Sequence, residues 1–258
     1  MTSVRMQGPA DEVVSASFCV LGLGDEVHWT SLALMHGLRS QGFRVAGLLP
    51  QADDVQWHRG RWHSERVLQL QEAGSFAFPV SALCPTVQGG SPGVPPPLLD
   101  IEAVVDAGSV LGTWADLVVV DALGTPDTGL AKHRAGRPVR PEAADMADVA
   151  LAMDWPVVVA CDDSGQGLHD ACQLVTRLRD RGLRVVAWIQ AGLTPMACAA
   201  GLVCVGAIPR TELREPVQAA RHVDLVRLLG VLGVRRSGAG PHAHGVSANA
   251  HKTGGRAG

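Results

Sequence analysis

The stretch Ser17-Phe-Cys-Val-Leu-Gly-Leu-Gly-Asp-Glu-Val-His-Trp-Thr-Ser31 begins with an apolar run, passes through a glycine-containing turn and continues with helical spacing. This is the layout of a loop that binds phosphate, because backbone N–H groups and a helix N-terminus then point at one anion. Such a loop normally closes with Gly-Lys-Thr, in which the ammonium group reaches the terminal phosphates and the hydroxyl group holds magnesium. Here the tripeptide is His28-Trp29-Thr30. The hydroxyl group is kept, and an indole replaces the ammonium group.

The bulk composition is that of a compact globular chain. Its 258 residues are 47% hydrophobic, which is enough for one α/β domain with a large core, or at most two small domains. A formal net charge of −3 gives no reason to expect a nucleic acid or an acidic membrane as partner. No apolar run reaches the length of a membrane span, and Met1 to Ala16 lack the apolar core of a signal peptide. We therefore expect a cytoplasmic protein.

The six cysteines show no C-x-x-C spacing and lie mostly in apolar segments. Cysteine in such surroundings behaves as a small buried hydrophobe. We expect neither disulfides nor a zinc site.

Apolar strand-like segments alternate with helix-like ones along the chain. The expected strands are 18–21, 44–48, 117–120, 156–160, 184–189 and 203–205. The expected helices are 29–40, 64–72, 101–111, 143–153, 168–181 and 223–232. This alternation predicts an α/β fold with a doubly wound, mostly parallel sheet and helices on both faces. Ligands bind such sheets at the carboxyl ends of the strands, so residues 23–30, 49–54, 121–125 and 161–167 are expected to share one rim.

One domain is expected over residues 17–235, after an N-terminal extension of residues 1–16. The tail, residues 236–258, is rich in Gly, Ala and His and has little to bury, so we expect it to be disordered. Its histidines, His242, His244 and His251, are expected to be solvated rather than metal-bound. Residues 88–97 and 124–141 are turn-rich and predict surface excursions.

Taken together, the rim segments resemble the dethiobiotin synthetases, a family of the P-loop NTPase superfamily. The family loop G-T-x-T-E-V-G-K-T is matched by Gly22 to Thr30, and the pair Glu26-Val27 in this register is the most specific part. The family motifs A-G-x-K-P-V, V-E-G-A-G-G, L-G-x-I-N-H and G-x-I-P are matched, the third loosely, by Ala46–Gln51, Val120–Thr125, Ser164–His169 and Gly206–Pro209. The resemblance covers residues 17–235, with an insertion at 125–141.

The resemblance implies a single P-loop NTPase-like domain and an ATP- and Mg²⁺-dependent reaction of biotin biosynthesis. In that reaction a ureido ring is closed on 7,8-diaminononanoate, a small-molecule substrate, with carbon dioxide. The family forms homodimers with active sites at the interface, so a homodimer is expected, with neither nucleic acid nor membrane as partner.

The resemblance also assigns site residues. The nucleotide-binding positions are Gly22, Glu26, Val27, His28, Thr30 and Ser31. The family's magnesium ligands correspond to Thr30, Glu65 and Asp121, all of which carry oxygen atoms suited to a hard cation. The alternative is that Thr30 caps its helix and that the two acids are simply solvated.

The lysines that the family uses for catalysis are missing. Their positions hold Trp29, Leu49 and, less securely aligned, Asp163. Phosphorylation of a carbamate builds negative charge, and losing one stabilising donor in such a site costs on the order of 10²–10³ in rate. Nothing in the sequence brings Arg59, Arg61 or Lys132 in as a substitute. The sequence therefore predicts an impaired or inactive synthetase.

The two residues that replace the Gly-Lys pair have alternative interpretations. Trp29 is expected to pack against the sheet, and stacking on a ligand is the alternative. His28 is a candidate general base only if a partner orients its ring.

Three functions stay open at this point. One is an active synthetase with altered phosphate contacts, and another is a noncatalytic partner or regulator of an active synthetase. The third is a partition-type ATPase or a cobyrinate-amidating enzyme. That third function is disfavoured because the chain lacks the lysine for ATP hydrolysis and the cysteine domain for amidation.

Overall fold

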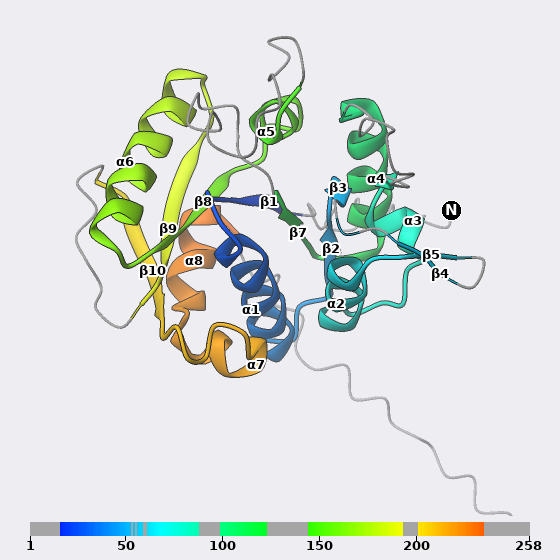
Figure 1. Cartoon of the computed structure of the whole chain (residues 1–258), viewed down its shortest axis with the longest axis horizontal. Coiled ribbons are helices and arrows are strands. Elements are labelled where there is room, and N and C mark those ends of the chain that lie inside the picture. Colours follow the sequence, from blue (N-terminus) through cyan, green and yellow to red (C-terminus); the bar gives the residue numbers. More distant parts are fainter. Residues whose placement is uncertain are drawn as a thin grey trace, which may run out of the picture.

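A central sheet of six parallel strands organises the chain, in the order β10-β9-β8-β1-β7-β2 (Figure 1). The computed structural model describes residues 16–52, 54, 56–58, 61–87, 99–122, 144–192 and 201–234. The strands of the sheet are β1 (Ala16–Leu21), β2 (Val45–Leu48), β7 (Leu117–Asp121), β8 (Val157–Asp162), β9 (Val185–Ala191) and β10 (Val203–Ile208). All six lie where the apolar runs predicted strands.

Burial on both faces explains why these segments are strands. Every residue of β2 and of β7 is buried, as expected for parallel strands covered by helices on each side. The doubly wound fold predicted from the sequence is confirmed. β10 continues to Ile208, three residues beyond its predicted end, because its pairing with β9 extends that far.

The helices cover both faces of the sheet (Figure 1). On one face α1 (Glu26–Ser40) packs with α7 (Pro216–Ala219), and α8 (Leu225–Leu232) packs against β9 and β10. The other face is covered by α4 (Ile101–Trp114), α5 (Met146–Ala152) and α6 (Gly165–Asp180). Between α1 and the edge strand β2 lies α2 (Glu65–Ala73).

Two helices begin three residues earlier than predicted. For α6, the reason is the hydroxyl group of Ser164, which accepts a hydrogen bond from the Gly167 N–H at 2.8 Å and caps the helix. For α1, helical turns already start at Glu26, directly after the glycine turn. The apolar periodicity begins later than the backbone helix in both cases.

Several short elements were not predicted. An antiparallel pair joins β4 (Gln56–His58) and β5 (Arg61–His63), and a parallel pair joins β3 (Gln51–Ala52) and β6 (Thr86–Val87). The remaining short elements are α3 (Val80–Leu83) and the 3₁₀ turn η2 (Ala220–His222). Elements of two to four residues are too short to show a period.

Several expectations lie outside the described residues. These are the extension up to residue 15, the tail with its three histidines, the excursions at 88–97 and 124–141, and the candidate cations Arg59 and Lys132. Among the described helices, none has the length and apolar character needed to span a bilayer.

None of the five described cysteines is part of a disulfide bond among the described residues; they are Cys19, Cys84, Cys161, Cys172 and Cys204. Burial raises the pKa of the Cys84 thiol to about 12, so this thiol stays protonated and behaves as a hydrophobe.

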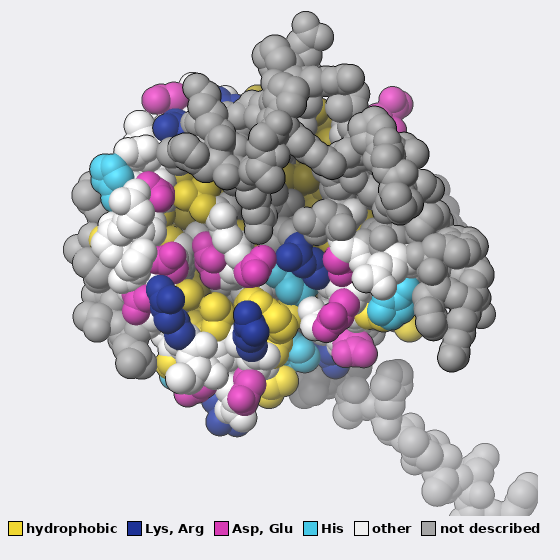
Figure 2. Space-filling view, viewed as in Figure 1, with side chains coloured by type: hydrophobic (Ala, Val, Ile, Leu, Met, Phe, Trp, Pro, Cys, Tyr) yellow, Lys and Arg dark blue, Asp and Glu magenta, His cyan; other side chains and the backbone are white. Residues whose placement is uncertain are grey.

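One face of the surface is shown in Figure 2, where acidic and basic side chains lie interspersed over the described residues of that face. One ion pair joins Arg44 and Asp116, the residues that directly precede β2 and β7. Arg44 donates to Asp116 from its backbone N–H at 2.8 Å and from Nη2 at 2.6 Å. Partial burial by itself raises the pKa of Asp116, but the hydrogen bonds and charge of Arg44 outweigh it and hold the pKa below its ordinary value.

This pair predicts a small acid sensitivity. A carboxyl group with a depressed pKa stabilises the fold above its unfolded pKa, and that stabilisation is lost as the pH falls through the folded pKa. We expect the wild type to lose up to about 1 kcal/mol more unfolding free energy than Asp116→Asn between about pH 6 and pH 3. Urea unfolding of both proteins at each pH measures this difference in unfolding free energy. Equal losses in the two proteins would show that the pair contributes nothing.

Candidate functional site

The loop between β1 and α1 lies directly against β8, and Gly22 makes this possible. A Cβ atom at Gly22 would lie 2.5 Å from the carbonyl oxygen of Ala160 and 2.6 Å from Cγ2 of Val27. Neither neighbour has room to move away, since Ala160 is strand backbone and Val27 is buried. The glycine at the start of the loop therefore sets the close approach of loop and sheet.

Gly22→Ala is accordingly expected to lower the free energy of unfolding by about 1–3 kcal/mol through overpacking. Denaturant unfolding measures the change. Gly165→Ala is the matched control, because a Cβ at Gly165, the first residue of α6, meets nothing within 4 Å. If both variants have wild-type stability, the loop does not need this contact.

A cavity of about 170 Å³ lies between the loop and the N-terminal end of α6. The described residues that line it include the carboxylates of Glu26, Asp162 and Asp170 and no lysine or arginine. Burial raises the pKa of Glu26, and the neighbouring charges of Asp162 and Asp25 add to the rise, against hydrogen bonds from backbone N–H groups of the loop. The cavity is thus acidic on the side where a phosphate would need cations.

A buried hydrogen-bonded chain crosses from β7 to α2 through the loop helix. Nδ1 of His28 lies 2.5 Å from Oδ2 of Asp121, and Nε2 lies 2.7 Å from Oε1 of Gln69. Gln69 in turn donates from Nε2 to Glu65, at 3.4 Å. The side chains of His28 and Asp121 are 3% and 0% exposed, so this ion pair is shielded from water.

Both ring nitrogens of His28 act as donors, because a carboxylate oxygen and an amide oxygen have no hydrogen to give. The ring is then an imidazolium cation. Burial by itself lowers the pKa of His28, but the hydrogen bond and charge of Asp121, with a further hydrogen bond to Gln69, outweigh it. The net pKa is raised, which agrees with the cationic form.

Trp29 lies half-buried against the core rather than in the loop turn. Its ring meets the ring of His28 edge-on, with centroids 5.5 Å apart. Val27, Thr30 and Ser31 are buried as well, and the Ser31 hydroxyl donates to the Val27 carbonyl at 2.9 Å. The first turns of α1 therefore present packed side chains where the family loop presents glycine and lysine.

The other two lysine positions are also without a cation of their own. Leu49 is fully buried in the core, and its N–H donates to the carbonyl of Leu83. Asp163 follows β8 and pairs with Arg210 at 2.7 Å. Arg210 was missed by sequence reasoning, although it directly follows the matched Gly-x-Ile-Pro motif at Pro209. The signal that could have found it is this adjacency, since that motif marks the same rim.

Two of the candidate magnesium ligands, Asp121 and Glu65, contact other side chains in this arrangement. Asp121 uses Oδ2 on His28, and its Oδ1 has no partner among the described residues. Glu65 is exposed and accepts a hydrogen bond from Gln69, which lies one helical turn after it in α2. Gln69 was not predicted as a site residue from the sequence. The described residues contain no cluster of three or more His, Cys, Asp or Glu side chains able to hold a metal ion. Magnesium in nucleotide sites is usually held by one or two carboxylates together with phosphates and water, and Oδ1 is the oxygen of Asp121 that has no partner among the described residues.

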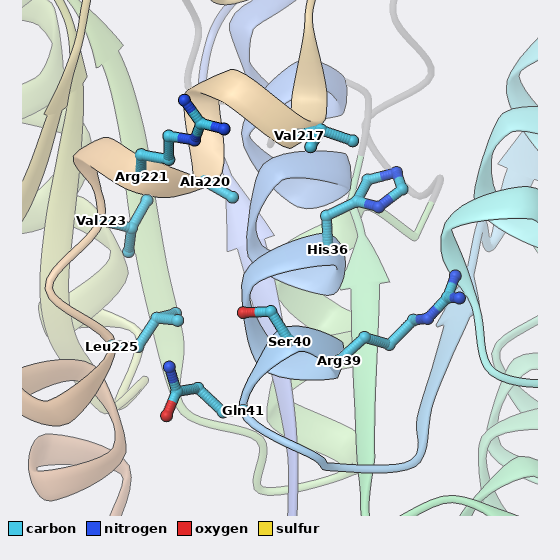
Figure 3. A pocket seen from close by; sticks show the side chains of 9 residues that line it. All are labelled: His36, Arg39, Ser40, Gln41, Val217, Ala220, Arg221, Val223 and Leu225. Atoms are coloured by element: carbon cyan, nitrogen blue, oxygen red, sulfur yellow. The ribbon is translucent and has the colours of Figure 1, made fainter.

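A larger hollow of about 630 Å³ lies at the other end of α1 (Figure 3). His36 and Arg39 of α1 and Arg221 of η2 lie at its edge. Burial and the charge of Arg39 lower the pKa of His36. Because α1 runs back from the loop, this hollow lies toward the amino ends of the strands, away from the rim.

Comparison with known proteins agrees with this fold. No protein-family model matches the chain. The chain is 29% identical over 233 residues to an ATP-dependent dethiobiotin synthetase from Ralstonia nicotianae, covering 81% of this chain and 96% of that protein. Its structure is similar to the MinD cell division protein of Aquifex aeolicus, with a TM-score of 0.52, 13% identity and coverage of 84% of this chain and 97% of that chain. MinD in the MinC:MinD complex of the same organism gives a TM-score of 0.50 at 12% identity, covering 83% and 96%. The resemblance to dethiobiotin synthetases and the P-loop NTPase-like fold are thus confirmed.

Proposed function

We propose that this dethiobiotin synthetase-like chain acts in biotin biosynthesis but does not perform ATP-dependent ring closure at the rate of its relatives. One observation carries the proposal. The three positions that supply lysines in the family hold a half-buried indole, a core leucine and a carboxylate, at Trp29, Leu49 and Asp163. Catalysis of phosphoryl transfer consists mainly of positioning and of stabilising negative charge with cations.

The geometry of the loop supports the same proposal. The cavity beside the loop is lined by Glu26, Asp162 and Asp170, which repel the phosphates of a nucleotide. In the family, bound Mg²⁺ would neutralise phosphate charge. In this chain Asp121, which matches a magnesium ligand of the family, is instead bound by the imidazolium group of His28. A diamine of the diaminononanoate type, being cationic, is electrostatically better matched to this rim than ATP.

The test combines binding and turnover. Purified protein is titrated with Mg-ATP in a calorimeter, and ATP-dependent conversion of 7,8-diaminononanoate is then assayed, with an active synthetase run in parallel. We expect no binding heat at submillimolar nucleotide and turnover at least about 10²-fold below the active enzyme. Binding together with turnover at the level of the active enzyme would overturn the proposal.

A second candidate is an active synthetase with altered phosphate contacts, and Arg210 favours it. This guanidinium group lies on the rim, 58% exposed, and pairs with Asp163 at the third lysine position. If Arg210 replaces the lysine, Arg210→Ala abolishes whatever turnover the wild type shows, and Arg214→Ala, in the turn between β10 and α7, does not.

The proposed noncatalytic role requires an assembly. We expect the chain to form a homodimer, or to pair with an active synthetase. Sedimentation of the chain alone and of a mixture with an active synthetase distinguishes the two. A monomer in both samples would count against a role as partner.

A further inference from the structure

Asp121 occupies the most enclosed position of the candidate site. It ends β7, which lies between β1 and β2 in the sheet, and its side chain is fully buried. An ionised carboxylate in such a place needs a partner that compensates its charge. In a P-loop protein of this family the magnesium ion supplies that charge from outside the chain.

In this chain the His28 ring lies against the Asp121 carboxyl group instead. Its Nδ1 lies 2.5 Å from Asp121, and the ring is held on its other side by Gln69, at 2.7 Å from Nε2. The edge of the His28 ring also packs against the indole of Trp29. Three contacts therefore fix the ring, and it cannot swing away without breaking all of them.

From these contacts we infer that the His28 side chain occupies the space beside Asp121 and closes that carboxyl group to magnesium. The inference rests on the proposed function, which it deepens by naming the residue that excludes the metal. A metal ion approaching Asp121 meets a ring that already holds one carboxylate oxygen at 2.5 Å. The second oxygen, Oδ1, has no partner among the described residues, so it becomes part of a cation site once the ring is removed.

The variant that tests this is His28→Ala, which releases Oδ2 of Asp121 beside the unpartnered Oδ1 without introducing a helix-breaking residue. Thermal unfolding is followed with increasing Mn²⁺, and with NaCl at matched ionic strength. We expect the melting temperature of His28→Ala to rise with millimolar Mn²⁺ and that of the wild type to stay unchanged. Direct Mn²⁺ binding, read by electron paramagnetic resonance without nucleotide, is expected to be at least about tenfold tighter in the variant.

The matched control is His28→Ala combined with Asp121→Asn, in which position 121 no longer carries a carboxylate that could bind the metal. This double variant is expected to lose the Mn²⁺ response. A folded His28→Ala protein that responds to Mn²⁺ no more than the wild type overturns the inference. So does tight Mn²⁺ binding by the wild type that Asp121→Asn abolishes, a measurement that does not require His28→Ala to fold.

The two proposals fail separately. Turnover of the diamine with ATP by the wild type at the level of an active synthetase would overturn the proposed function, whereas the Mn²⁺ measurements contain no nucleotide and no diamine. A wild type that neither turns over nor binds Mn²⁺, beside a variant that binds it, supports both.

Discussion

His28→Ala lowers the free energy of unfolding by about 3–5 kcal/mol in metal-free buffer near neutral pH, because it leaves a buried carboxylate without its cation. The exposed fractions of the two side chains, 3% and 0%, leave water little access to solvate Asp121. The carboxyl group must then either stay charged in an apolar environment or take up a proton, and both are costly. Denaturant unfolding monitored by circular dichroism measures the change.

A double-mutant cycle isolates the pair. Asp121→Asn alone is expected to cost less than His28→Ala, because the imidazole group that it leaves behind can lose its charge near neutral pH. The double variant is expected to be more stable than the sum of the two single losses indicates. The exposed Arg44–Asp116 pair serves as reference, since Asp116→Ala costs only about 0–1 kcal/mol. Strict additivity at His28 and Asp121 would contradict the ion pair.

Restoring the family loop increases nucleotide affinity. His28→Gly combined with Trp29→Lys is expected to tighten Mg-ADP binding by about 10–100-fold, since a charge-assisted hydrogen bond contributes about 1.5–3 kcal/mol. The glycine releases Asp121 and lets phosphate approach the backbone, and the lysine returns the ammonium group to the loop. Calorimetric titration with Mg-ADP measures the gain.

Trp29→Lys alone is the control and is expected to gain less, because His28 still holds Asp121 and fills the start of α1. Neither variant is expected to restore ring closure, since Leu49 and Asp163 still occupy the other lysine positions. Equal affinities in the wild type and the double variant would show that the loop residues do not control nucleotide access.

The architecture could be predicted because parallel strands are continuous apolar runs. Both sides of such a strand are buried, so apolar residues follow one another without alternating with polar ones. Examples are Val118–Val120 and Val157–Val159. The first residues of the helices were harder to predict, because the polar residue Ser164 caps α6 three residues before the apolar face of that helix begins. The pairs β3–β6 and β4–β5 depend on tertiary contacts that leave no local pattern.

For the candidate site, the sequence predicted which residues lie there but not the contacts that they make. The loop motif placed His28, Trp29 and Thr30 at a helix start, and the structure agrees. That His28 binds Asp121 is a contact across 93 residues, which local periodicity cannot reveal. Gln69 and Arg210 were missed for the same reason, because each acquires its partner from a different element of the fold.

The strand order has a consequence for how the chain folds. β1 is hydrogen-bonded on one side to β7 and on the other to β8, both of which follow it by about a hundred residues or more. Contacts that close such long loops raise the contact order and slow folding, because chain entropy is lost before the contacts form. The His28–Asp121 pair bridges the first turn of α1 and the end of β7, so it forms only after β1 and β7 have docked. In a variant that keeps Trp29 as its single tryptophan, fluorescence is expected to follow that docking step in refolding experiments.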